Sequence, residues 1–115
     1  MKEASVLLLC AIVLCGCTEN LNQDAFAKCL GQKGVKMYGA EWCGHCESQK
    51  DAFGASWQYV NYVECADPTG TQAPACRDAG ITGYPTWEFA NGSRSEGQLS
   101  LDELGAITGC EMNHS

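Results

Sequence analysis

Two cysteines separated by two residues, Cys43 and Cys46, have the residue type and spacing best suited to chemistry in this sequence. They follow a short apolar stretch (35–38) that predicts a strand, and they open a segment with helical spacing. A thiol in the first turn of a helix lies among free backbone N–H groups at the positive end of the helix dipole, which favours its thiolate form. We therefore predict that Cys43 attacks disulfides. Cys46, almost one turn later, would displace Cys43 from a mixed disulfide and release the product.

The same spacing also occurs in haem-attachment and zinc sites. A haem site has a histidine directly after the second cysteine, whereas Glu47 stands there. A compact zinc site needs a second close pair, and the nearest candidates, Cys65 and Cys76, have ten residues between them. The predicted strand and helix around Cys43 and Cys46 favour redox chemistry, so no metal or other cofactor is predicted. A zinc-binding or purely structural module is the alternative from a different class.

The composition limits the partners and the compartment. The chain of 115 residues has room for one domain with a modest core. Its formal net charge of −7, without a basic stripe, argues against a nucleic-acid partner. Nine cysteines in so short a chain indicate an oxidising compartment.

The N-terminal residues have the features of an export signal. An apolar run over 6–16 follows a short and weakly charged start. Eleven residues are too few to cross a bilayer as a helix. The residues Leu-Cys-Gly-Cys at 14–17 resemble the lipobox of bacterial lipoprotein signals, which implies cleavage before Cys17 and a lipid on this cysteine. Cleavage elsewhere nearby and an uncleaved anchor are the alternatives.

These features divide the chain into three predicted parts: a lipoprotein-type signal peptide (1–16), a tether (17–21) and a domain (22–115). The lipid would anchor the domain to a membrane on its extracytoplasmic side, in the periplasm or at the cell surface. Cleavage before Cys17 would leave six other cysteines, for which fifteen pairings are possible. They are Cys29, Cys43, Cys46, Cys65, Cys76 and Cys110.

Hydrophobic periodicity and turn residues predict four helices and four strands in the domain. The expected order begins with a helix capped by Asn22 or Asp24, a strand (35–38) and the redox helix, which Gly54 weakens or bends and in which Glu47, Lys50 and Asp51 are expected to be solvated. A strand (59–64), a short helix (73–79) and a hairpin (86–89 and 94–97) follow. The last helix is capped by Ser100 and Glu103 and has a core face of Leu101, Leu104 and Ile107. A parallel pair of strands joined through the redox helix, followed by a hairpin and a helix, is the βαβ plus ββα layout of a thioredoxin fold. We therefore predict an α/β domain with a central mixed four-stranded sheet and flanking helices.

Two motifs, WCGHC (42–46) and GYPT (83–86), resemble those of the thioredoxin superfamily. More narrowly, the phrases KMYGAEWCGHCESQK, NYVEC, GYPTWE and SLDELGAITGC resemble the thioredoxin-like domain of bacterial and plant vitamin K epoxide reductase homologues. This resemblance implies a partner of a quinone-linked membrane thiol oxidase that passes disulfides to thiol-containing exported proteins. The four-helix membrane part of those homologues is not in this sequence, so such an oxidase is expected as a separate polypeptide.

The resemblance also implies roles for single residues. Pro85 would follow a cis peptide bond and lie against the two cysteines, and Tyr84 and Thr86 would flank the contact with an extended client segment. A plain loop proline is the alternative for Pro85. Trp42 belongs either to the client-facing rim or to the core.

Gly44 and His45 stand between the cysteines and are expected to modulate their reactivity. An imidazole beside the helix N-terminus would stabilise the Cys43 thiolate, which makes the pair more oxidising. The Gly-His dipeptide resembles that of protein disulfide isomerase. We therefore favour oxidation or isomerisation of disulfides over reduction, with a reductase of the same fold as the alternative. A solvent-exposed turn residue is the alternative for His45.

The other four cysteines are expected to form two structural disulfides, Cys65–Cys76 and Cys29–Cys110. The first would fix a loop near the active site, and the second would tie the ends of the domain together. A second redox pair at Cys65 and Cys76, relaying electrons to the first, is the alternative.

Proton transfer is the point at which the sequence departs from the superfamily. Many thioredoxins have a buried aspartate six residues before the first cysteine, whereas Met37 stands there in this chain. Glu41 and Glu64 are the candidate substitutes.

Overall fold

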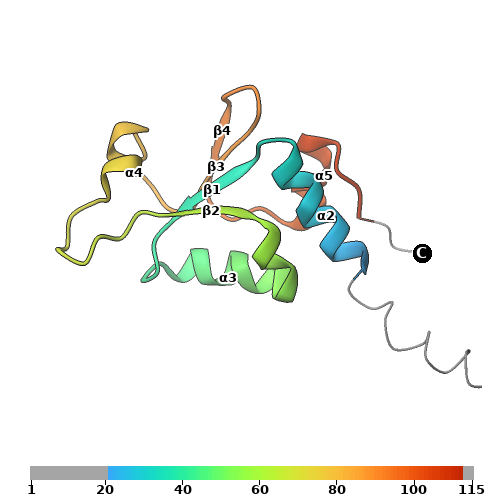
Figure 1. Ribbon diagram of the computed structural model, residues 1–115, viewed down its shortest axis with the longest axis horizontal. Coiled ribbons are helices and arrows are strands. Elements are labelled where there is room, and N and C mark those ends of the chain that lie inside the picture. The colour runs from blue at the N-terminus through green and yellow to red at the C-terminus, as the bar shows by residue number, and fades with distance from the viewer. Residues whose placement is uncertain (1–20, 113–115) are drawn as a thin grey trace, which may run out of the picture.

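The computed structural model describes residues 21–112 (Figure 1). The predicted signal peptide (1–16), the lipidation of Cys17 and all of the predicted tether except Leu21 lie outside the described residues. Between residues 21 and 112, none of the helices combines the length and the apolar composition needed to cross a lipid bilayer.

The elements of the described chain follow the predicted order with one addition, a 3-10 helix after the redox helix. They are α2 (Leu21–Gln32), β1 (Lys36–Gly39), α3 (Gly44–Phe53), η1 (Gly54–Tyr59), β2 (Asn61–Glu64), α4 (Pro74–Asp78), β3 (Thr86–Glu88), β4 (Arg94–Glu96) and α5 (Leu101–Thr108). The expectation that the redox helix continues through Gly54, weakened or bent there, is wrong. Gly54 has φ 57°, a left-handed conformation that suits glycine and ends α3, and the chain continues as η1.

The four strands form one mixed sheet in the order β2-β1-β3-β4. The two strands β1 and β2 are parallel and are joined through α3, whereas β3 pairs antiparallel with both β1 and β4. Helices α2 and α5 lie side by side at one end of the domain, and α4 lies at the other end (Figure 1). This arrangement confirms the predicted α/β class and the thioredoxin fold.

The main core lies between one face of the sheet and three helices, α2, α3 and α5. Met37 of β1 and Trp87 of β3 are directly paired, and both side chains are fully buried on this face. Phe26, Leu30, Phe53 and Leu104 close the core from the helices. Cys46 belongs to the same cluster, so the packing that stabilises the fold also fixes the position of the redox helix.

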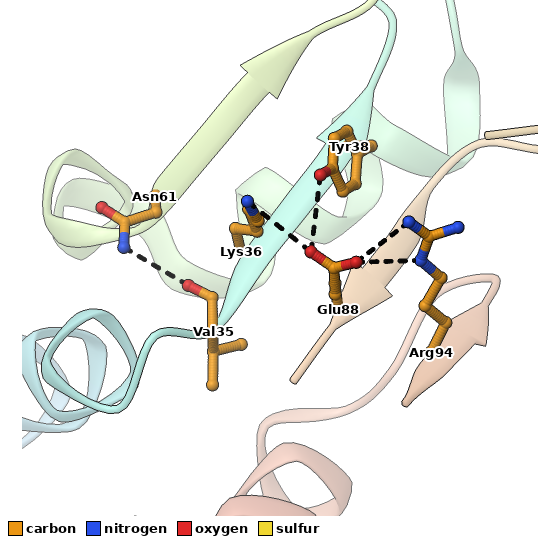
Figure 2. Close-up of polar contacts among 6 residues, drawn as sticks. All are labelled: Val35, Lys36, Tyr38, Asn61, Glu88 and Arg94. Carbon is orange, nitrogen blue, oxygen red and sulfur yellow. Dashed lines mark hydrogen bonds and ion pairs between the residues drawn. The ribbon is translucent and has the colours of Figure 1, made fainter. Parts of the chain in front are cut away.

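A polar network covers part of the opposite face of the sheet (Figure 2). Glu88 of β3 is at its centre. It accepts hydrogen bonds from Arg94 at 2.9 and 3.0 Å and from the Tyr38 hydroxyl at 3.4 Å, and its carboxylate lies 3.6 Å from Lys36 Nζ. Opposite charges on neighbouring strands stabilise a sheet, and here they join β1, β3 and β4.

Helix α5 begins as predicted and ends differently. Ser100 and Glu103 form the expected capping box, and Leu104 is buried. The prediction that Ile107 continues the core face is wrong, because its side chain is 50% exposed. Each step of three residues along a helix falls about 60° short of a full turn, so Ile107 has rotated out of the face that Leu101 begins.

Candidate active site

Cys43 stands at the junction of strand and helix, between the end of β1 and the first residue of α3. It is the N-cap residue of α3, and its Sγ accepts a hydrogen bond from the Cys46 backbone N–H at 3.3 Å. The Cys43 side chain is 8% exposed, whereas Cys46 is fully buried, and both are free thiols. The Cys46 amide and the positive end of the helix dipole therefore act on the Cys43 sulfur, which is the more accessible of the two.

The loop before β3 brings the GYPT motif to the same sulfur. The Tyr84–Pro85 peptide bond is cis, and the Tyr84 carbonyl accepts a hydrogen bond from Cys43 Sγ at 3.7 Å. Pro85 is fully buried, and the buried Thr86 donates from its hydroxyl to the Gly83 carbonyl at 2.7 Å. The backbone of Tyr84 is thus the part of the motif that touches Cys43. The expected contact of Tyr84, Pro85 and Thr86 with a client stays a prediction.

The residues around the cysteine pair are open to solvent. Trp42 is 71% exposed and packs edge-to-face on Tyr84, with ring centroids 5.7 Å apart, so it belongs to the rim and not to the core. Gly44 is exposed, and a Cβ there would have no neighbour within 4 Å. The His45 side chain is exposed as well and has no hydrogen-bond or ion-pair partner among residues 21–112. The expected influence of Gly44 and His45 on the pair stays a prediction.

Cys46 is enclosed from the side of β1 by Gly39. A Cβ on Gly39 would lie 3.1 Å from Cys46 Sγ and 2.9 Å from Tyr62 Cε1, so a larger residue would displace one of them. Burial and the neighbouring Cys43 raise the pKa of Cys46 from its ordinary value of 9.0 to about 11. Cys46 therefore holds its proton at neutral pH and must lose it when it attacks.

Two residues of β2 face Cys46. Tyr62 and Glu64 pair with Met37 and Gly39 in the sheet, which places them on the α3 side, and the Tyr62 hydroxyl donates to Glu64 Oε1 at 2.7 Å. Lys50 of α3 completes the group, because its Nζ lies 4.5 Å from the centroid of the Tyr62 ring. The expectation that Lys50 is solvated is wrong, since its side chain is only 22% exposed.

Glu64 is the better placed of the two candidate substitutes for a buried aspartate. Its Oε2 accepts hydrogen bonds from the backbone N–H groups of Glu41 at 2.9 Å and of Ala66 at 3.0 Å. Burial by itself would raise the pKa of Glu64, but the hydrogen bonds from Tyr62, Ala66 and Glu41 hold it below its usual value. Glu64 therefore stays ionised beside the Tyr62 hydroxyl, whereas Glu41 is exposed and contributes its backbone.

Gln49 is a positioning residue that the sequence analysis missed. Its fully buried side chain accepts from Trp87 Nε1 at 3.1 Å and from the Leu99 N–H at 2.8 Å, and it donates to the Leu99 carbonyl at 2.8 Å. Gln49 thereby fixes α3 to β3 and to the chain that leads into α5. Its place three residues after Cys46, on the buried face of the helix, is the signal that could have identified it.

The other four cysteines among residues 21–112 form the two disulfides expected from the sequence, Cys29–Cys110 and Cys65–Cys76. The first joins α2 to the chain after α5, and the second joins the end of β2 to α4. Cys65 and Cys76 are almost completely buried, which argues against direct exchange with clients or with Cys43. Because they are bonded to each other, they do not offer the second thiolate pair that a zinc site with Cys43 and Cys46 would need.

No protein family model matches the chain. The curated proteins that are similar to it include two that are named for thiol–disulfide chemistry. The thiol-disulfide oxidoreductase LTO1 of Arabidopsis thaliana is 43% identical over 96 residues, which cover 79% of this chain and 25% of that protein. The probable protein disulfide-isomerase ER-60 of Schistosoma mansoni is 33% identical over 101 residues, which cover 76% of this chain and 20% of that protein. The chain thus spans about a quarter or less of the length of these relatives.

Fold, site and similarity agree. The sheet and its helices have the thioredoxin arrangement, the Cys43–Cys46 pair is reduced and close together at the start of a helix, and both relatives are named for thiol–disulfide chemistry. Together these findings support a place for the chain in the thioredoxin-like superfamily, among the relatives of thiol–disulfide oxidoreductases.

Proposed function

We propose that this chain is an extracytoplasmic protein thiol–disulfide oxidoreductase that oxidises or isomerises disulfides in exported proteins. One observation carries the proposal: Cys43 caps α3 and keeps some access to solvent, while Cys46 lies fully buried behind it. This asymmetry suits an attacking sulfur and a resolving sulfur. The names of the two relatives support the same chemistry.

In the oxidising direction, the pair begins as a Cys43–Cys46 disulfide. A client thiolate attacks the Cys43 sulfur, the Cys43–Cys46 bond breaks, and Cys46 leaves as a thiolate that takes up a proton. A second client thiolate then attacks the client sulfur of the mixed disulfide, and Cys43 leaves. The client gains one disulfide, and its two electrons now reside in the Cys43–Cys46 dithiol. The Cys46 amide that donates to Cys43 Sγ stabilises the Cys43 thiolate as it leaves.

Isomerisation uses the reduced pair. The Cys43 thiolate attacks a client disulfide, one client sulfur leaves as a thiolate, and a different client thiolate later expels Cys43. No electrons are gained or lost overall. When no client thiolate expels Cys43, Cys46 attacks the Cys43 sulfur of the mixed disulfide. The client then leaves reduced, and the Cys43–Cys46 disulfide forms.

Repeated oxidation needs an acceptor for the two electrons left in the dithiol. A quinone-linked membrane thiol oxidase, related to vitamin K epoxide reductases and separate from this chain, is the proposed acceptor. A lipid on Cys17 would hold the domain at the same membrane surface. The resemblance of the sequence motifs around 36–50 and 83–88 supports this partner.

The redox potential of the Cys43–Cys46 pair tests the direction of the reaction. The protein is equilibrated with glutathione buffers, and the free thiols are counted by alkylation and mass spectrometry, with Cys43→Ser and Cys46→Ser as controls. We expect a value near that of protein disulfide isomerase, about −180 mV. A value near that of thioredoxin, about −270 mV, would identify a reductase instead.

A further inference from the structure

A cavity of about 450 Å³ opens beside the attacking sulfur. One wall is the aromatic pair of Trp42 and Tyr84, and Tyr84 contacts Cys43 through its carbonyl. The other wall is the loop over 65–72, between β2 and α4. The volume lies in the range of about 300–1,000 Å³ that is usual for ligand sites. A client whose cysteine reaches Cys43 would therefore place neighbouring residues at this cavity.

Internal contacts hold the loop wall in place. The Asp67 N–H donates to the Thr71 carbonyl at 3.2 Å, and Ala66 and Gln72 form an isolated β-bridge. Gln72 Nε2 also donates to the Tyr84 hydroxyl at 2.8 Å, which connects the loop to the aromatic wall. The Cys65–Cys76 disulfide closes the loop at its base. The cavity is thus preformed, and a bound side chain would not need to order it.

The charged side chains that line the cavity are both acidic. Glu41 and Asp67 are the charged residues among those that line the cavity within residues 21–112. The backbone N–H and the hydroxyl of Thr69 donate to Asp67 Oδ1 and hold the pKa of this carboxyl below its usual range. Arg77 lies outside the lining and binds the Gln72 carbonyl at 3.4 Å, so it offsets only part of the negative charge.

The exposed ring of Trp42 adds a second feature that suits a cation. It is 71% exposed at the cavity wall, and an indole face attracts ammonium and guanidinium groups. A carboxylate in the same cavity would meet Glu41 and Asp67 and would be repelled.

We propose that this cavity is a client subsite that holds a lysine or arginine side chain next to the reacting client cysteine. The proposal rests on the proposed function, because it assigns a preference to the same site. It predicts that clients with a basic residue beside the cysteine exchange faster than clients with an acidic one.

Three peptides test the preference. They are identical except for Lys, Ala or Glu beside a single cysteine, which carries a mixed disulfide with glutathione, and they react with the reduced protein under pseudo-first-order conditions. We expect the Lys peptide to react about tenfold faster than the Glu peptide at low salt, with a smaller ratio at high salt because the charges are screened.

A charge-matched pair of variants locates the effect. The double variant Glu41→Gln and Asp67→Asn should lower the Lys-to-Glu ratio to about twofold or less. Its fold should persist, because the Glu41 backbone still donates to Glu64 and the amide introduced by Asp67→Asn retains an oxygen that accepts from Thr69. The double variant Asp51→Asn and Glu111→Gln removes the same charge from exposed positions outside the cavity and should keep the full ratio.

The outcomes separate this proposal from the proposed function. Exchange with the Ala peptide shows that the protein is active. With that activity present, equal rates for the Lys and Glu peptides would overturn the subsite. Equal Lys-to-Glu rate ratios in the two double variants would overturn it as well. Failure of all three peptides to react, the Ala peptide included, would overturn the proposed function and the subsite with it.

Discussion

The Tyr62 hydroxyl donates a hydrogen bond to Glu64 Oε1 at 2.7 Å, on the side of β2 that faces Cys46. With Lys50 over the Tyr62 ring, this contact makes a small polar group beside a sulfur that is otherwise enclosed by the main core. Cys46 has to release a proton before it attacks, and its raised pKa of about 11 makes that step unfavourable at neutral pH. Charges close to Cys46 therefore affect how fast a client is released.

The first prediction concerns Lys50, whose positive charge favours the Cys46 thiolate. Lys50→Met should raise the pKa of Cys46 further and slow the attack of Cys46 on a Cys43 mixed disulfide about fivefold near pH 7, for an interaction of about 1 kcal/mol. Stopped-flow measurement of client release between pH 6 and 10 would show the profile shifted to higher pH. Lys50→Arg should restore it.

Lys28 supplies the matched control for Lys50. Its Nζ lies 4.6 Å from the centroid of the Tyr59 ring, so Lys28→Met removes a similar lysine–tyrosine contact from another part of the fold. Its release profile should coincide with that of the unmodified protein. Coincident profiles for Lys50→Met and Lys28→Met would contradict the role of Lys50.

The second prediction concerns stability at alkaline pH. Cys46 ionises near 9.0 when unfolded and near 11 when folded, so between these values the proton leaves the unfolded state first. The free energy of unfolding of the reduced protein should therefore fall as pH rises through this window, by up to about 3 kcal/mol. Urea unfolding of the reduced protein and of Cys46→Ala, with a reductant mild enough to spare the two disulfides, isolates this effect. Parallel pH dependences would disprove it.

Local sequence patterns predicted the cysteine pair because its chemistry depends on neighbours in the chain. A thiol at a helix start has its amides supplied by the next few residues, so the position of Cys43 follows from spacing alone. The neighbours of Cys46 depend instead on tertiary contacts between α3 and β2. The position of β2 is set by the register that pairs Gly39 with Glu64, and no local sequence pattern predicts this register. Lys50, expected in solvent, lies against Tyr62 for this reason.

The third prediction compares two glycines close to the cysteine pair. Gly39→Ala would place a methyl group 2.9 Å from Tyr62 Cε1 and 3.1 Å from Cys46 Sγ, which forces a shift and should cost about 1–3 kcal/mol of stability. Gly44→Ala meets nothing within 4 Å and should change stability by less than about 1 kcal/mol. Thermal unfolding of both variants tests the contrast, and equal stabilities would show that Cys46 is not tightly enclosed.

The fourth prediction concerns Gln49. Gln49→Leu keeps the helix and much of the volume but leaves Trp87 Nε1 and the Leu99 backbone without their partner, which should cost about 2–4 kcal/mol. Ser48→Ala changes the exposed neighbouring residue and should be nearly neutral. Urea unfolding measures both. A loss of less than about 1 kcal/mol in Gln49→Leu would mean that water replaces the missing hydrogen bonds.

The last prediction separates stability from client binding through the two disulfides. Cys29–Cys110 closes a loop with a sequence separation of 81, and Cys65–Cys76 one of 11, so the chain-entropy model gives losses of about 4–5 and about 3 kcal/mol on removal. The double variant Cys29→Ala and Cys110→Ala should thus unfold at lower urea concentration. The double variant Cys65→Ala and Cys76→Ala should lose less stability and should in addition lose the preference for the Lys peptide, because this disulfide closes the loop wall of the cavity beside Cys43. The Cys29→Ala and Cys110→Ala variant should keep this preference although it is the less stable of the two, and loss of the preference in that variant would contradict the separation.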